Sequence, residues 1–351
     1  MDRLPRTRLP HVIVRSLSIA LLAGCSERPL YPEEGVEPAP VWDRTHDVEQ
    51  LIRDNANDLV IAADGDIYVV GSGAGGTAHT DPASQEISGF AAAFDRFGAL
   101  LWTEIIDGTS QPGSTDAIFQ AALPDPTGGV WAGGAHGVRD FGVAEWKPWL
   151  VHYTAEGDAH GFDISADIPD SSVIQAMDWL DHDTLAVAFM TYGEVATVRV
   201  ATYALDSGVP EHRWSRDFAL DETALGLPCP TTRMVLRAVD EVHMMFALNT
   251  CDLEDEPAGV VATLSAHDGD LDAMWRGDDA ASLAPMGLHR FTIHDLVVTE
   301  DAILLAGAGA DGPELFARAM VVAMDPDTFT PRWTHAEPQG YVSSLDAYLT
   351  L

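Results

Sequence analysis

Two short acidic sequences carry oxygen ligands at a spacing that could hold a cation. Asp64-Gly65-Asp66 and Asp268-Gly269-Asp270 each place two carboxylates around a glycine. A calcium loop needs about six oxygen ligands at set positions and a terminal Glu, and neither sequence supplies them. We therefore expect tight turns here, with weak calcium binding as the alternative, and we predict no dedicated metal site.

The histidines and carboxylates form no recognisable catalytic motif. His289 and His294 stand five apart in a segment with strand character, so alternation along the strand directs their rings to opposite faces. No GxSxG sequence marks a nucleophilic serine. Carboxylates are too abundant for one pair to stand out as a general acid and base. We assign no residue to catalysis, and we lean towards a protein that is not an enzyme.

A glycine-rich run, Gly71-Ser72-Gly73-Ala74-Gly75-Gly76, follows the apolar segment 67–70. The GxGxxG spacing could hold a dinucleotide pyrophosphate, but only where a helix begins next. The following residues, 77–85, contain Pro82 and no apolar helical period. Similar Gly/Ala clusters recur at 133–134 and 306–310. We interpret the run as part of a repeated structural unit, and we predict no cofactor.

Two cysteines in the body of the chain, Cys229 and Cys251, bracket the strand-like segment 234–248. A disulfide between them would close a loop of about 22 residues and stabilise the fold by roughly 3 kcal/mol. An exported protein would favour the disulfide, and two buried free thiols are the alternative. No CxxC sequence or histidine pair accompanies them, which disfavours a metal site.

The elements that position these residues come from a unit that recurs five times. Each copy ends in an aromatic residue, and the successive spacings are 60, 52, 61 and 58 residues; the aromatics are Trp102, Phe162, Trp214, Trp275 and Trp333. An aspartate opens the preceding turn in four copies, at Asp95, Asp206, Asp268 and Asp325, and Thr154 takes its place in the second copy. Such an Asp accepts hydrogen bonds from the backbone of its own turn. We expect the aromatic ring to pack on the neighbouring unit, because one unit cannot bury its apolar face alone.

Four strand-like segments precede or contain each aromatic residue. The first segments are 59–63, 118–123, 173–179, 234–239 and 293–298. The second segments are 67–72, 130–134, 185–190, 242–248 and 303–307. The third segments are 90–95, 149–154, 197–205, 260–265 and 319–325, and the fourth carry the aromatics. Helical periodicity is nearly absent, apart from short turns expected around 48–54.

Four short antiparallel strands at this period predict the blades of a β-propeller. The Asp-turn-Trp element is similar to the PQQ-like repeats of bacterial propellers, and the resemblance covers about 290 residues of the chain. That resemblance implies work through protein–protein contacts, as in accessories of outer-membrane assembly. Quinone binding does not follow, because no cofactor constellation accompanies the repeats. We predict an all-β propeller of about five four-stranded blades over residues 42–351.

The ends of the propeller leave two alternatives open. Trp42 lies 60 residues before Trp102, in phase with the repeat, and 341–351 (YVSSLDAYLTL) resembles the first strand of a further unit. Together they would supply only two strands of an incomplete sixth blade. Either five blades close with irregular ends, or the chain is a truncated member of a longer family.

The N-terminus resembles a bacterial lipoprotein signal. Four arginines precede an apolar stretch, 16–24, that is too short to span a membrane and ends in Leu22-Ala23-Gly24-Cys25. The resemblance implies a signal peptide over 1–24, acylation of Cys25 and a Pro/Glu-rich tether over 25–41. Ser26 fits delivery to the outer membrane, on its periplasmic face or at the cell surface. An ordinary secretory signal is the alternative.

The charge of the processed chain excludes one class of partner. Removing four Arg and one Asp from 19 basic and 55 acidic side chains leaves 15 and 54, a formal charge of −39. Nucleic-acid binding rests on Lys and Arg, so we exclude it. We expect the protein to contact the membrane only through its lipid anchor.

We therefore expect a monomeric, lipid-anchored envelope propeller that binds or scaffolds other envelope proteins through its loops. The alternatives are a protein that binds or acts on polysaccharide, and a truncated paralogue without independent function.

Overall fold

The structure is a computed structural model. It describes residues 51–75, 87–107, 111, 114–140, 143–168, 171–192, 197–205, 208–219, 227–228, 234–251, 257–279, 283–299, 301–310 and 318–336. Cys25, the tether, Trp42, Asp206, Cys229 and residues 341–351 lie outside these ranges. Among the described residues, no helix has the length and apolar character needed to cross a membrane.

The chain forms five antiparallel sheets in sequence order. The first contains β1 (Leu51–Ile61), β2 (Ile67–Gly75), β3 (Ile87–Phe94) and β4 (Leu100–Asp107). The second contains β5 (Asp116–Pro124), β6 (Val130–Asp140), β7 (Val143–Tyr153) and β8 (Ala159–Asp163). The third contains β9 (Ser171–Trp179), β10 (Thr184–Tyr192), β11 (Thr197–Ala204) and β12 (Glu211–Ala219).

The last two sheets repeat the pattern. The fourth contains β14 (Val235–Ala238), β15 (His243–Cys251), β16 (Pro257–Ser265) and β17 (Leu271–Arg276), and the two-residue β13 (Leu227–Pro228) also pairs with β15. The fifth contains β18 (Arg290–Val298), β19 (Ile303–Ala310), β20 (Arg318–Met324) and β21 (Pro331–Ala336). The four strands that the sequence predicts for each repeat are therefore confirmed.

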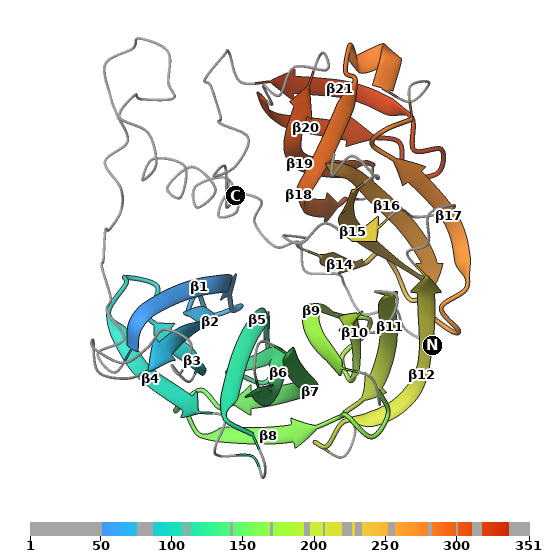
Figure 1. Cartoon of the computed structure of the whole chain (residues 1–351). Helices are drawn as coiled ribbons and strands as arrows, with labels where there is room; N and C mark the ends of the chain where they lie inside the picture. The colour runs from blue at the N-terminus through green and yellow to red at the C-terminus, as the bar shows by residue number, and fades with distance from the viewer. Residues whose placement is uncertain are drawn as a thin grey trace, which may run out of the picture.

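Figure 1 shows the sheets side by side along an arc around a common centre. The strands β1, β5, β9, β14 and β18 lie innermost, and β4, β8, β12, β17 and β21 lie outermost. The first and fifth sheets stand at the two ends of the arc. This arrangement of four-stranded antiparallel sheets is that of a β-propeller.

The apolar core lies between consecutive sheets. Tyr68 and Val70 of the first sheet share a buried cluster with Phe119 and Trp149 of the second. Three further clusters join the second sheet to the third, the third to the fourth, and the fourth to the fifth. Each central strand is covered on both faces, which explains why its residues are almost continuously apolar rather than alternating.

The sequence interpretation fails at the start of the first sheet. Helical turns were expected around 48–54, but β1 begins at Leu51, which pairs with Gly75. Pairing with β2 overrides the weak local preference of these residues.

The glycine-rich runs on the second strands match β-bulges on the first strands. Gly71, Gly134 and Gly307 each pair with the residue just before a bulge. A Cβ on these glycines would lie 2.0, 1.9 and 1.8 Å from the carbonyl oxygens of Asn55, Ile118 and Thr292. The Gly/Ala clusters are therefore a feature of the repeat, as predicted. Gly71–Gly75 lies within β2, so the GxGxxG sequence begins in a strand.

Candidate functional site

The predicted turn aspartates within the described ranges, Asp95, Asp268 and Asp325, each cap their own turn. Asp95 Oδ1 accepts hydrogen bonds from the backbone N–H of Phe97 and of Ala99, both at 2.8 Å. Asp268 and Asp325 accept from the residue two positions on, at 3.2 and 3.1 Å. In the second acidic sequence, Asp268-Gly269-Asp270, the Asp268 carboxylate is therefore used within the turn.

Three of the predicted aromatics contact the next sheet. Trp102 Nε1 donates to the carbonyl oxygen of Ala155 in the second sheet at 3.0 Å. Trp214 Nε1 of the third sheet donates to that of Ala266 in the fourth at 3.1 Å. Trp275 is buried against Phe291, whereas Trp333 at the end of the arc is 52% exposed. These contacts hold the sheets in place and leave the tryptophans unsuited to chemistry.

Carboxylates of the innermost strands also join the sheets. Asp58 Oδ2 accepts from the backbone N–H of Ala122 at 2.8 Å, and Asp178 Oδ2 from that of Ala238 at 2.7 Å. Burial raises the pKa of Asp178, and the hydrogen bond from the Ala238 backbone N–H acts in the opposite direction. Both carboxylates have backbone partners from the next sheet, so they are tied into the structure rather than presented to a ligand.

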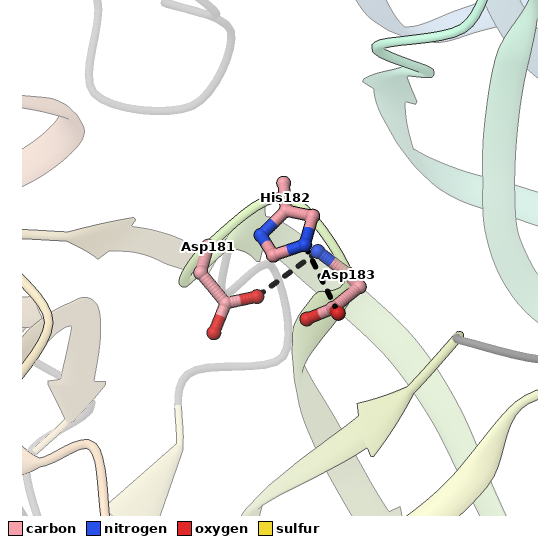
Figure 2. Close-up of side chains that lie close together, drawn as sticks. All are labelled: Asp181, His182 and Asp183. Carbon is pink, nitrogen blue, oxygen red and sulfur yellow. Dashed lines mark hydrogen bonds and ion pairs between the residues drawn. The ribbon is translucent and has the colours of Figure 1, made fainter. Parts of the chain in front are cut away.

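An exposed group of three ligand-type side chains lies in the turn between β9 and β10. Figure 2 shows Asp181, His182 and Asp183, whose nearest ligand atoms all lie within 4.8 Å of one another. Asp181 Oδ1 accepts from the Asp183 backbone N–H at 3.0 Å, and His182 Nε2 lies 3.2 Å from Asp183 Oδ2. Burial acts against ionisation of Asp181, but hydrogen bonds from Asp183 and Thr184 lower its pKa. Three ligands are half of what calcium requires, so the group is best described as a capped turn.

A shallow cavity of about 380 Å³, open to solvent, lies between the first and second sheets. Its lining residues are Ile105, Ile106, Asp107, Gln111, Trp149, Ala159 and Gly161. It combines an apolar wall from β4 with a carboxylate, an amide and an indole. Convergence of a few polar groups on an apolar hollow is the usual character of a small-ligand site.

Trp149 brings an unpaired hydrogen-bond donor to this cavity. The side chain is only 2% exposed, and its Nε1 has no hydrogen-bond partner in the structure. A Cβ added to Gly161 would lie 2.8 Å from that nitrogen. Gly161 also lines the cavity, and its lack of a side chain lets β8 lie close against the indole ring, whose Nε1 is buried. A buried donor without a partner is costly, and such groups call for an explanation.

A polar chain made of Ser114, His136 and Asp163 lies behind the indole. Ser114 Oγ is 2.7 Å from His136 Nδ1, and His136 Nε2 is 3.8 Å from Asp163 Oδ2. Burial lowers the pKa of His136, while Asp163 acts in the opposite direction, so the ring is neutral at pH 7. The edge of His136 contacts the Trp149 ring at a centroid distance of 5.5 Å.

These three residue types occur in nucleophilic relays, but the geometry differs. The His–Asp separation exceeds a hydrogen bond, and Ser114 is buried. The arrangement as it stands positions Trp149 rather than activating a serine.

Sequence reasoning missed this site entirely. Trp149, Gly161 and Gln111 belong to different segments, and no motif links them. The one available signal was an aromatic residue, Phe90 or Trp149, at the start of the third strand-like segment in the first two repeats.

Comparison with known proteins finds only distant structural likeness. No protein-family model and no curated protein sequence matches the chain. A putative 6-phosphogluconolactonase from Bacteroides uniformis ATCC 8492 aligns at 15% identity and a TM-score of 0.44, over 82% of this chain and 72% of that one. A β-fructofuranosidase from Bombyx mori aligns at 11% identity and a TM-score of 0.42, over 78% and 63%. An α-L-arabinofuranosidase from Podospora anserina aligns at 8% identity and a TM-score of 0.41, over 79% and 90%.

Proposed function

We propose that this chain is a binding propeller of the cell envelope, and that the cavity between its first two sheets takes a saccharide unit of a surface or envelope polysaccharide. The observation that carries the proposal is the buried, unpaired N–H of Trp149 beside an open cavity. A hydroxyl or carbonyl oxygen of a ligand would accept that hydrogen bond once β8 moves away at Gly161, because the nitrogen is buried in the structure as it stands.

The remaining walls suit the same ligand. Gln111 offers both a hydrogen-bond donor and an acceptor to hydroxyl groups. Ile106, which packs on the same cluster as Trp149, presents apolar surface to the C–H face of a sugar ring. An anionic ligand is disfavoured by Asp107 and by the formal charge of −36 on the whole chain.

The proposal is tested with the indole N–H signals in NMR spectra, which report each tryptophan separately. Glucose, N-acetylglucosamine and their short oligomers are titrated into the protein, and Trp149→Phe identifies the Trp149 signal. We expect that signal to shift, and Trp149→Phe to weaken binding by about 3- to 10-fold, as the loss of one hydrogen bond predicts.

Two further variants sharpen the test. Gly161→Ala places a Cβ 2.8 Å from Trp149 Nε1, which forces β8 or the indole to shift, and it should also weaken binding. Trp146→Phe changes another tryptophan of β7 that does not line the cavity, and it should bind normally. Equal binding by all variants, or no binding by the unchanged protein, would contradict the proposal.

We also propose that the chain is a lipoprotein of the bacterial outer membrane, acylated at Cys25. The apolar stretch that ends at Leu22-Ala23-Gly24-Cys25 supports this. The intact mass of the native protein extracted from membranes tests it. A mass of residues 25–351 plus acyl chains is expected, and a mass without lipid would mean a soluble exported protein.

A second candidate function, protein scaffolding, is favoured by the acidic turns at one end of the sheets. Turns between first and second strands and between third and fourth strands share that end, and they carry Asp64, Asp95, Asp125, Asp181, Asp240, Asp268 and Asp325. Hydrogen bonds from Ser265 and from the Asp270 backbone lower the pKa of Asp268, which keeps it ionised.

These acidic turns would attract a basic partner protein. Cross-linking on native membranes tests this, with Asp268→Asn and Asp325→Asn expected to reduce capture of a specific basic partner. If neither variant changed the capture, the acidic turns would not be the binding surface.

A further inference from the structure

Trp102 and Trp214 join consecutive sheets by the same contact. Each indole N–H donates to the second residue of the turn before the outermost strand of the next sheet, Ala155 or Ala266. The glycine of that turn lies on the ring. A Cβ on Gly157 would be 3.0 Å from Trp102, and one on Gly269 would be 2.5 Å from Trp214.

The first sheet carries the same turn. Gly98 N–H donates to Asp95 O at 2.8 Å, as Gly157 N–H donates to Thr154 O at 3.0 Å. Gly98 has a φ of 80°, close to the 94° of Gly157. Gly98 is buried although its neighbour Phe97 is 63% exposed, and Gly157 shows the same pattern beneath Trp102. No sheet of the described residues precedes the first sheet in sequence. The tryptophan that would lie on Gly98, as Trp102 lies on Gly157, is therefore not among the described residues.

The spacing along the chain identifies the occupant. Gly157 lies 55 residues after Trp102, and Gly269 lies 55 residues after Trp214. Gly98 lies 56 residues after Trp42.

We propose that Trp42 packs on Gly98 and donates its indole N–H to the carbonyl oxygen of Arg96. The segment around Trp42 then forms an outermost strand beside the first sheet, in the place of a further blade. With the anchor proposed at Cys25, this contact limits the free tether to 17 residues, a reach of about 60 Å when fully extended.

Thermal unfolding of the full-length chain tests the contact. Trp42→Ala should lower the melting temperature by about 5 °C or more, and Trp102→Ala should lower it by a similar amount. Trp333→Ala, at an exposed position, should change it little. The reverse result, a cost at Trp333 and none at Trp42, would mean that the fifth sheet itself closes on the first, and it would overturn the proposal.

A glycine pair provides a matched control. Gly98→Ala and Gly208→Ala introduce similar strain, because both glycines have a positive φ (80° and 73°), but a Cβ on Gly208 meets nothing within 4 Å. Gly98→Ala should therefore cost more than Gly208→Ala, and the excess should vanish in the Trp42→Ala background. Equal costs of the two glycine substitutions would refute the contact.

Hydrogen exchange keeps the proposal testable where a variant fails to fold. In the unchanged protein, amides around Trp42 should be protected to the same degree as those around Trp102. Exchange at the rate of an unstructured peptide would overturn the proposal.

Discussion

Asn249 and Ile293 exchange two hydrogen bonds across the boundary between the fourth and fifth sheets. Asn249 Nδ2 donates to Ile293 O at 2.7 Å, and Ile293 N–H donates to Asn249 Oδ1 at 2.7 Å. A side-chain amide thus pairs with β18 as a neighbouring backbone would. Because Asn249 is buried, the backbone N–H and C=O of Ile293 depend on its amide for these hydrogen bonds.

Removing this amide should destabilise the protein. Asn249→Ala leaves a buried N–H and C=O of Ile293 unpaired, so we expect a loss of about 2 to 4 kcal/mol in urea unfolding. Asn249→Asp should also destabilise, because the acid lacks the donor for Ile293 O. Asn55→Ala, at an exposed amide, serves as control and should stay within about 0.5 kcal/mol. A neutral Asn249→Ala would mean that water replaces the amide.

Gly134 should not tolerate a side chain. A Cβ there would lie 1.9 Å from the backbone oxygen of Ile118, which cannot move without disturbing the bulge in β5. We expect Gly134→Ala to cost at least about 3 kcal/mol by the same measurement. At Gly208 only the backbone is strained, so Gly208→Ala should cost about 1 kcal/mol. Equal losses at both sites would show that crowding is not the reason for glycine at 134.

Asp325 has a lowered pKa of about 2, and the hydrogen bond from Arg332 is the largest cause of this lowering. Arg332→Gln should raise this pKa towards the ordinary value of 3.8. Titration of the carboxyl carbon by NMR measures the change. Arg216→Gln, which removes the partner of Asp270 instead, should leave Asp325 unchanged. An unshifted Asp325 in Arg332→Gln would assign its low pKa to the turn alone.

Stability should fall as the pH drops below about 6.5, the ordinary pKa of a histidine. Burial lowers the pKa of His136 in the folded chain, and the pKa of His152 is lowered for the same reason. The unfolded chain therefore binds protons that the folded chain does not, and the stability present above pH 6.5 is lost as the pH falls towards the folded pKa.

Urea unfolding between pH 5 and 7.5 measures this dependence. His136→Gln should reduce the slope, whereas His160→Gln, at an exposed position, should not. An identical slope in His136→Gln would place the effect elsewhere.

The predicted disulfide is tested by mass spectrometry. Cys251 ends β15, where it pairs with Leu227 of β13, two residues before Cys229 in sequence. With a disulfide, the unfolded and unreduced protein should leave both cysteines unalkylated. Alkylation at Cys229 and Cys251 without reduction would establish two free thiols.

The sequence by itself determined the strand content, the number of repeats and the capped turns. These depend on local chemistry: an aspartate such as Asp95 bonds to its own turn, and apolar runs such as 185–190 bury both faces wherever they lie. The period of the repeat then required units that pack on one another. Even the glycine-rich run at Gly71 could be recognised as a repeat feature, because it recurred in phase.

Only the tertiary structure decided which side chains meet between sheets. Trp149 and Gly161 lie on paired strands, and Gln111 joins them only because the first two sheets pack together. Asn249 likewise finds Ile293 44 residues away. Contacts of this kind depend on the angle and spacing of whole sheets, which no local pattern encodes. For that reason the repeat was readable from the chain, and the cavity was not.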